Sequence, residues 1–195
     1  MKPRGQRGGE SKMSAFSSIA GLLVAGVLLA CAAGGPAQGD NAMAFELKSA
    51  AFTSGGDIPK KFTCDGADVS PALSWNEPPE KTASFGLIAD DPDAPVGTWV
   101  HWVLYDLPAP ARALPEGVAK KENLDSGARQ GRNDFGRIGY GGPCPPAGAP
   151  HRYFFKLYAL DTKANLKPGA TKADLEKAMK GHILAQTELM GRYKR

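Results

Sequence analysis

The segment Trp99–Leu107, WVHWVLYDL, constrains the fold most strongly because it is apolar on both sides. Side chains alternate between the two faces of a strand, so each face is expected to carry its own set: Trp99, His101, Val103 and Tyr105 on one, Val100, Trp102 and Leu104 on the other. A strand with two apolar faces is expected in the centre of a sheet that is covered on both sides. A histidine within it needs a hydrogen-bond partner, for which a backbone carbonyl is sufficient.

Composition favours strands joined by irregular loops over a helical bundle, because the 195 residues include 24 glycines and 16 prolines. Further strands are expected at Phe45–Phe52, Ala72–Trp75, Ser84–Asp90 and Arg152–Leu160. Pro92 stops the third of these, so the sequence predicts Asp90 and Asp91 at a sheet edge near solvent. The segment 108–150 has little periodicity, and a loop of that length in a compact domain is usually functional.

One helix is expected near the C-terminus. Thr171 and Asp174 have the spacing of a capping box. Residues at helical spacing follow it, so the pattern predicts a helix that covers one face of the sheet and includes Leu175, Ala178, Met179, His182 and Gln186. The basic residues Arg192, Lys194 and Arg195 are then expected at its C-terminal end, where they suit the helix dipole.

Residues 1–44 have the features of an export leader. A basic region contains Lys2, Arg4, Arg7 and Lys12, and the apolar run Phe16–Ala30 has the length of a signal-peptide core rather than of a membrane span. Two forms of processing remain open. Cys31 ends a lipobox-like LLAC and would carry a lipid anchor, or the small residues of AMA at 42–44 would direct cleavage before Phe45. Both predict an exported protein, in the periplasm or anchored to the cell envelope, with a single domain over 45–195.

Export affects how the remaining cysteines are interpreted. Once Cys31 is removed or lipidated, Cys64 and Cys144 are left, and an oxidising compartment permits a disulfide between them. Two unpaired thiols near a pocket are the alternative.

The net charge of +4 is spread along the chain without a basic block, so no nucleic-acid partner is indicated.

The segment Gly139–Tyr153, GYGGPCPPAGAPHRY, has the features of a ligand pocket. Its glycines allow close approach of backbone to a ligand, and the N–H groups of Gly141–Cys144 are suited to an anion-binding nest. The strand that follows carries His151 and Tyr153 on one face. A carboxylate such as Asp91 would hold one imidazole in a fixed tautomer, and the two histidines and the tyrosine would present donors to a phosphate or carboxylate.

Six segments, in this order, resemble one known family. They are CDGADVSPALSW (64–75), DDPDAP (90–95), WVHWVLYDLP (99–108), NDFGRIGYGGPCPP (133–146), HRYFFKLYALD (151–161) and MKGHILAQTELMGRY (179–193). The chain is similar, over residues 45–195, to the phosphatidylethanolamine-binding protein family. It resembles most its bacterial branch, often called Raf-kinase-inhibitor-like.

The resemblance implies a mainly β fold of two packed antiparallel sheets with peripheral helices. It also implies a cavity for phosphate, phosphorylated head groups or carboxylates, formed by Asp91, His101, His151 and Tyr153 with a rim of Tyr140, Gly142, Pro143 and Cys144. Cys144 stands about where eukaryotic members carry glycine, and the loop before His151 is one residue shorter. The helical segment that closes the cavity in animal members has no visible counterpart, so the head-group preference does not transfer.

The leading interpretation is an exported binding protein, without cofactor or metal, that holds a small anion and modulates a partner protein. The alternative is an inhibitor of a kinase or protease that acts through the cavity rim. His101, His151 and Asp91 would also suit a two-histidine, one-carboxylate metal set. An enzyme is nevertheless disfavoured, because the sequence has no G-x-S-x-G elbow, H-E-x-x-H helix or P-loop.

Overall fold

The structure is a computed structural model that describes residues 44–195. The predictions for the leader, including lipidation of Cys31, lie outside the described residues. No helix within residues 44–195 is long and apolar enough to cross a membrane.

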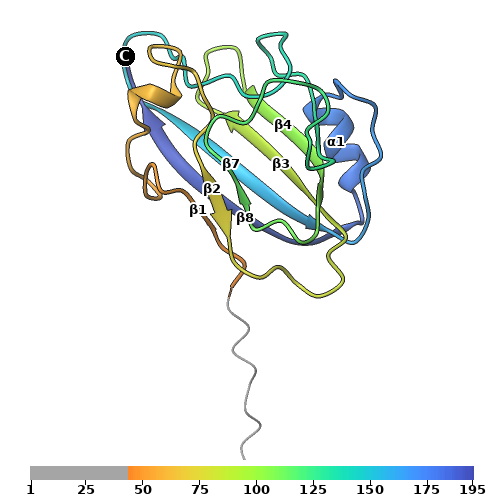
Figure 1. Ribbon diagram of the computed structural model, residues 1–195. Helices are drawn as coiled ribbons and strands as arrows, with labels where there is room; N and C mark the ends of the chain where they lie inside the picture. The colour runs from red at the N-terminus through yellow and green to blue at the C-terminus, as the bar shows by residue number, and fades with distance from the viewer. Residues whose placement is uncertain (1–43) are drawn as a thin grey trace, which may run out of the picture. The chain divides into compact units, whose positions relative to one another are not determined.

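Two antiparallel sheets form the domain, as expected (Figure 1). The larger sheet has the order β6-β4-β3-β7-β8, and the smaller has the order β1-β2-β5. In chain order the strands are β1 Leu47–Lys48, β2 Leu73–Trp75, β3 Ser84–Asp91, β4 Trp99–Pro108, β5 Ala113–Leu114, β6 Arg129–Gln130, β7 His151–Leu160 and β8 Ile183–Tyr193. A short 3-10 helix, η1, spans Lys60–Phe62, and α1 spans Lys172–Met179.

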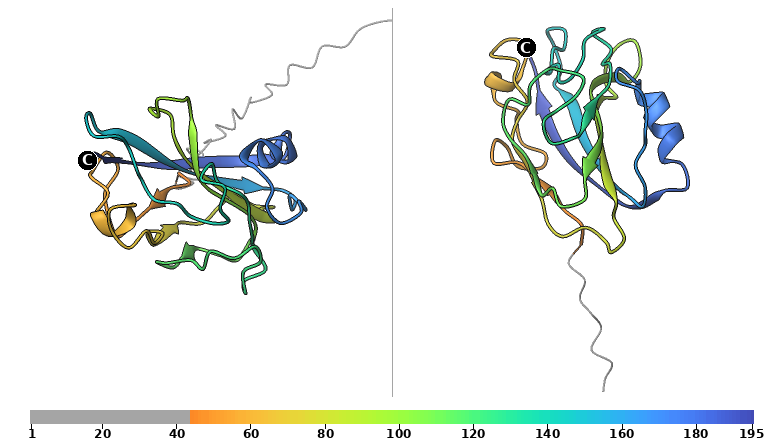
Figure 2. Two further views of the ribbon diagram at one scale, coloured as in Figure 1. Left: turned by 90° about the horizontal axis from the view of Figure 1, so that it is seen from above. Right: turned by 45° about the vertical axis from the view of Figure 1, so that its right-hand side comes forward.

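The two faces of the larger sheet are covered differently (Figure 2). The smaller sheet packs on one face and contributes Leu47, Trp75 and Leu114 to the main core. Helix α1 packs on the other face, where Leu175 and Met179 join a second cluster. The long segment 108–150 contains only two strands, of two residues each, and otherwise runs as loop.

Strand β4 is buried as predicted, but a β-bulge changes which residues share a face. Ala89 pairs with Trp102 and Asp90 with Val100, so His101 is the extra residue on β4. Val100 therefore packs beside α1 in the cluster that contains Val103 and Tyr105. The His101 ring lies on the opposite face, 5.2 Å from the ring of Tyr153. The simple alternation, which grouped His101 with Val103 and Tyr105, was wrong at this point.

The prediction that Asp90 and Asp91 lie near solvent was also wrong. Asp90 is 1% exposed and Asp91 is 3% exposed. Pro92 does end the strand region, but β4 and β7 flank β3 on both sides and cover its last residues. Each carboxylate also has a nearby cation or donor, which is how a buried charge is tolerated.

The predicted C-terminal helix is shorter than its pattern suggested. The capping box at Thr171 is present, but the helix ends at Met179. Gly181 then adopts a φ of +83°, a conformation that commonly follows helix C-termini. Ile183–Tyr193 forms β8, which pairs with β7 along its whole length and so satisfies that strand's free edge. His182 and Gln186, and the basic residues from Arg192 onward, therefore do not belong to a helix.

Candidate functional site

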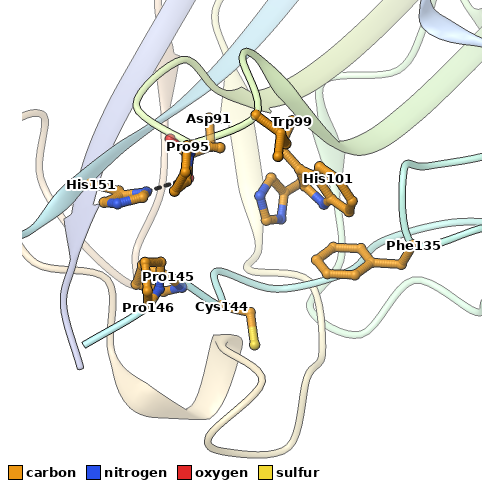
Figure 3. Close-up of a pocket in the computed structure, with 11 residues that line it drawn as sticks. Asp91, Pro95, Trp99, His101, Phe135, Cys144, Pro145, Pro146 and His151 are labelled. Carbon is orange, nitrogen blue, oxygen red and sulfur yellow. Dashed lines mark hydrogen bonds and ion pairs between the residues drawn. The ribbon is translucent and has the colours of Figure 1, made fainter. Parts of the chain in front are cut away.

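A cavity of about 220 Å³ opens at one end of the larger sheet (Figure 3). It lies where β3 ends and where β4 and β7 begin. The turn after β3 and two segments of the long loop complete its wall. The lining residues are Asp91, Ala94, Pro95, Val96, Trp99, His101, Phe135, Cys144, Pro145, Pro146 and His151.

The turn after β3 is attached to the start of β7 by two side-chain contacts. Asp91 accepts from the Asp93 backbone N–H at 2.8 Å, which shapes the turn, and from His151 Nδ1 at 2.8 Å. Asp93 in turn accepts from the backbone N–H and the guanidinium of Arg152, at 2.7–2.9 Å. Hydrogen bonding to Arg152 lowers the pKa of Asp93 to about 2. The orientation of the His151 ring is thus set by a carboxylate that is itself fixed.

His101 is held by the opposite wall. Its Nδ1 donates to the Gly141 carbonyl at 2.7 Å, and its ring makes edge contacts with Phe135 and Tyr153. The side chain is buried, and burial lowers the pKa of the imidazole. At neutral pH the ring is therefore uncharged, with its proton on Nδ1.

Both imidazoles use the same nitrogen to bind the protein. Nδ1 of His101 is engaged by a carbonyl and Nδ1 of His151 by Asp91. No hydrogen bond to Nε2 of either ring occurs within residues 44–195. In Figure 3 the two histidines lie on opposite sides of the cavity that both of them line. Two Nε2 atoms are thus available to one small ligand.

The expected anion nest is not available at Gly141 and Gly142. The Gly141 N–H donates to the His101 carbonyl at 2.9 Å, and the Gly142 N–H donates to Asp68 Oδ1 at 2.6 Å. A Cβ at position 142 would lie 2.4 Å from the Phe62 carbonyl oxygen. These glycines therefore allow close packing of the loop on the protein, and their N–H groups are not free for a ligand.

Other predicted rim residues lie behind the wall rather than on it. The cavity lining includes Cys144 but not Tyr140, Gly142 or Pro143. Tyr140 is 1% exposed and donates its hydroxyl to the Phe62 carbonyl at 2.7 Å. Its role in this structure is to hold the loop in place.

Tyr153 is buried beneath His101 and is likewise not part of the lining. Its hydroxyl is buried and has no hydrogen-bond partner among the described residues. Burial, followed by the negative charge of Asp91, raises the pKa of this hydroxyl, so it stays protonated.

A disulfide between Cys64 and Cys144 joins the segment after η1 to the cavity wall. The Cys64 backbone N–H also donates to the Pro143 carbonyl at 3.1 Å. On the far side, Asp65 binds the Arg195 guanidinium and the Tyr193 hydroxyl, and these contacts lower the pKa of its carboxyl. The end of β8 thus supports the segment that carries Cys64.

Sequence reasoning missed the apolar part of the cavity. Trp99 and Phe135 pack edge to face with ring centroids 5.5 Å apart, and both line the cavity. The bulge at His101 and the course of a long loop bring them together, and neither is visible in a periodicity pattern. Trp99 and Phe135 lie within two of the family-like segments, 99–108 and 133–146, and their presence there was the sequence signal for an apolar cavity wall.

The residues considered as a metal set do not form one here. Within residues 44–195, no three His, Cys, Asp or Glu side chains are grouped closely enough to hold a metal ion. Asp91 and His151 bind each other, whereas His101 binds a backbone carbonyl.

The comparisons with known proteins agree on a family. The family model described as phosphatidylethanolamine-binding protein matches residues 48–194. The chain belongs to this family. Over 152 residues it is 54% identical to a UPF0098 protein of Aquifex aeolicus, covering 77% of this chain and 88% of that protein.

Solved structures of the phosphatidylethanolamine-binding protein family share the fold. CT736 of Chlamydia trachomatis, described as a homologue of this family, is 44% identical with a TM-score of 0.71, covering 77% of this chain and 97% of that one. YbcL of Escherichia coli, described as a member of the mammalian family, is 35% identical with a TM-score of 0.73, covering 77% and 98%. The expected fold of two antiparallel sheets is thereby confirmed.

Proposed function

We propose that this chain is a binding protein for a small anion, not an enzyme. The observation that carries the proposal is the pair of imidazoles whose Nδ1 atoms are fixed by the protein and whose Nε2 atoms remain for a ligand. A cavity of about 220 Å³ suits a phosphate-sized group, since pockets for drug-sized ligands start near 300 Å³. The family is named for a ligand with a phosphorylated head group.

His151 is the group best placed to contact the anion as a donor. Asp91, 2.8 Å from Nδ1, fixes the ring so that an N–H at Nε2 would point to a ligand oxygen in the cavity. Trp99, Pro145 and Pro146 give the cavity apolar walls, which suit the carbon atoms attached to a phosphorylated or carboxylated group.

Titration with inorganic phosphate, followed by amide NMR, tests this function. We expect saturable shifts at residues around the cavity, from Asp91 to His101 and from Gly141 to Tyr153. Replacing His101 or His151 by Ala should weaken binding by about tenfold or more, because each loses a hydrogen bond to a charged group.

The chain offers a matched control for these variants. His182 Nδ1 contacts Asp161 at 2.8 Å, the same pairing as in the cavity, but its side chain is 48% exposed and lies elsewhere. His182→Ala should leave phosphate binding unchanged. Absence of saturable shifts in the wild-type chain would refute the proposed function.

We also propose that the protein is exported, as its leader predicts. The disulfide supports this, because such bonds persist mainly in oxidising compartments. A cytoplasmic location in fractionated cells that produce the whole chain would contradict export.

A partner protein that responds to the ligand would meet the cavity at its lip, where Val96 is 77% exposed.

A further inference from the structure

The charges at the cavity are unusual for a site that binds an anion. Its eleven lining residues include no lysine or arginine, and Asp91 adds a carboxylate. Three arginines of the surrounding segments make contacts of their own and are not among the lining residues. Arg152 binds Asp93 and Arg195 binds Asp65, while Arg137 stacks 5.2 Å from the centre of the Phe135 ring. A dianion would therefore enter this cavity with little positive charge to balance it.

The two histidines offer different hydrogen-bonding groups to a ligand. His101 donates Nδ1–H to the Gly141 carbonyl, and the buried ring is neutral, so its Nε2 carries a lone pair and accepts. A fully ionised oxyanion has only acceptor oxygens and would face this lone pair without a proton between them. A buried acceptor left opposite another acceptor is costly.

A ligand with one acidic proton removes both difficulties. Its hydroxyl donates to His101 Nε2, its ionised oxygens accept from His151 Nε2–H, and its charge is only −1. Phosphomonoesters lose their second proton near pH ~6, so close to neutral pH both ionisation states are present and the cavity can select the singly protonated one.

We propose that the cavity selects singly protonated oxyanions, and that His101 is the residue that sets this specificity by accepting the ligand's P–OH. The ligand class is the monoanion of a phosphomonoester or phosphonate. Sulfates, sulfonates and phosphodiesters, including the phosphate of an intact phospholipid, lack that proton and bind more weakly. The inference rests on the anion-binding function proposed above and specifies its ligand.

Two small probes test the inference directly. Methylphosphonate with one proton and methanesulfonate have the same shape and the same charge of −1, and differ by the acidic proton. Calorimetric titration at a pH where methylphosphonate carries one proton should give a preference for it of about tenfold or more, the value of one hydrogen bond. Dimethyl phosphate, a diester without a P–OH, should bind as weakly as methanesulfonate.

The variant His101→Ala should bind methylphosphonate and methanesulfonate with nearly equal affinity, because the Nε2 acceptor is removed. A second measurement does not depend on that variant folding. In the wild-type complex with methylphosphonate, ¹⁵N NMR of the imidazoles should show His101 neutral and protonated on Nδ1.

The outcomes separate the two proposals. Equal affinity for methylphosphonate and methanesulfonate, or an imidazolium at His101 in the complex, overturns the specificity while anion binding stands. If none of the three probes and no inorganic phosphate binds, the proposed function itself fails.

Discussion

Neighbouring carboxylates in this fold have different surroundings, and Asp90 and Asp93 show the contrast most clearly. Asp90 is 1% exposed, and its oxygens accept from Lys156 at 2.8 Å and Lys172 at 2.6 Å. It thereby connects β3 with β7 and with the first residue of α1. Asp93 binds Arg152 with good geometry, but in a pair that water can reach.

We therefore expect Asp90→Asn to lower the free energy of unfolding by about 1.5–3 kcal/mol, the range for hydrogen bonds to charged groups. Asp93→Asn, the matched control, should change it by less than about 1 kcal/mol because exposed ion pairs contribute little. Urea unfolding of both variants measures the difference. Equal decreases in the free energy of unfolding would show that burial does not determine how much these ion pairs stabilise the fold.

Asp93 also predicts a dependence on pH. Its pKa is lowered to about 2, below the ordinary value of about 3.9, so the Arg152 pair stabilises the fold above pH ~4. This contribution should be lost as the pH falls from about 4 through 2. The Asp93→Asn variant should lack this component of the acid response, and an unchanged pH profile would contradict the assignment.

At the scale of single residues, the sequence predicted which side chains interact better than it predicted how deeply they are buried or which face of a strand they occupy. The pairing of a histidine with a carboxylate was anticipated, and the structure has it between His151 and Asp91. The burial of Asp90 was not, because the cations that neutralise it come from residues 66 and 82 positions away. The face of His101 was misassigned because a bulge adds one residue to β4 and alternation cannot reveal that.

At the scale of elements, strands with strong patterns were predictable and strands defined by their partners were not. β3, β4 and β7 have bounds within one residue of those expected. β5 and β6 are two residues long and exist only because a neighbour pairs with them. The helix expected from the sequence extended to Gln186, but Ile183 already begins β8, which pairs with the free edge of β7.

The loop segment around Cys144 forms one wall of the cavity and is held by a disulfide and by backbone hydrogen bonds. Replacing Cys64 and Cys144 together by Ser should lower the free energy of unfolding by about 2–5 kcal/mol, because the bridge closes a long stretch of chain. Phosphate affinity should change little, since the Cys64–Pro143 and Gly142–Asp68 hydrogen bonds remain.

Reduced wild-type protein is the control for this pair of substitutions and should match the double variant in thermal unfolding. Unfolding at the same temperature in oxidised and reduced protein would show that the bridge does not restrain the fold. A loss of phosphate binding in the well-folded variant would show that the disulfide itself shapes the site.

At the scale of the whole molecule, the fold explains why the site lies where it does. Three neighbouring antiparallel strands place the end of β3 beside the starts of β4 and β7, so Asp91, His101 and His151 meet although they are far apart in the chain. The smaller sheet and α1 each cover part of one face of the larger sheet. A phosphate-sized cavity is left at this one end, with a loop of 108–150 to complete it.

Simple electrostatics would send an anion to a different place. A cleft of about 320 Å³ near the C-terminus is lined by Arg192 and Lys194 together with Asp57, whereas the cavity of the two histidines has no lysine or arginine in its lining. The two locations are therefore competing binding sites for an anion within the same molecule.

A crystal structure of the protein with methylphosphonate decides between them. We expect the phosphonate within hydrogen-bond distance of Nε2 of both His101 and His151, with the Asp91–His151 contact kept. A phosphonate bound only at Arg192 and Lys194, with the histidine cavity holding none, would contradict it.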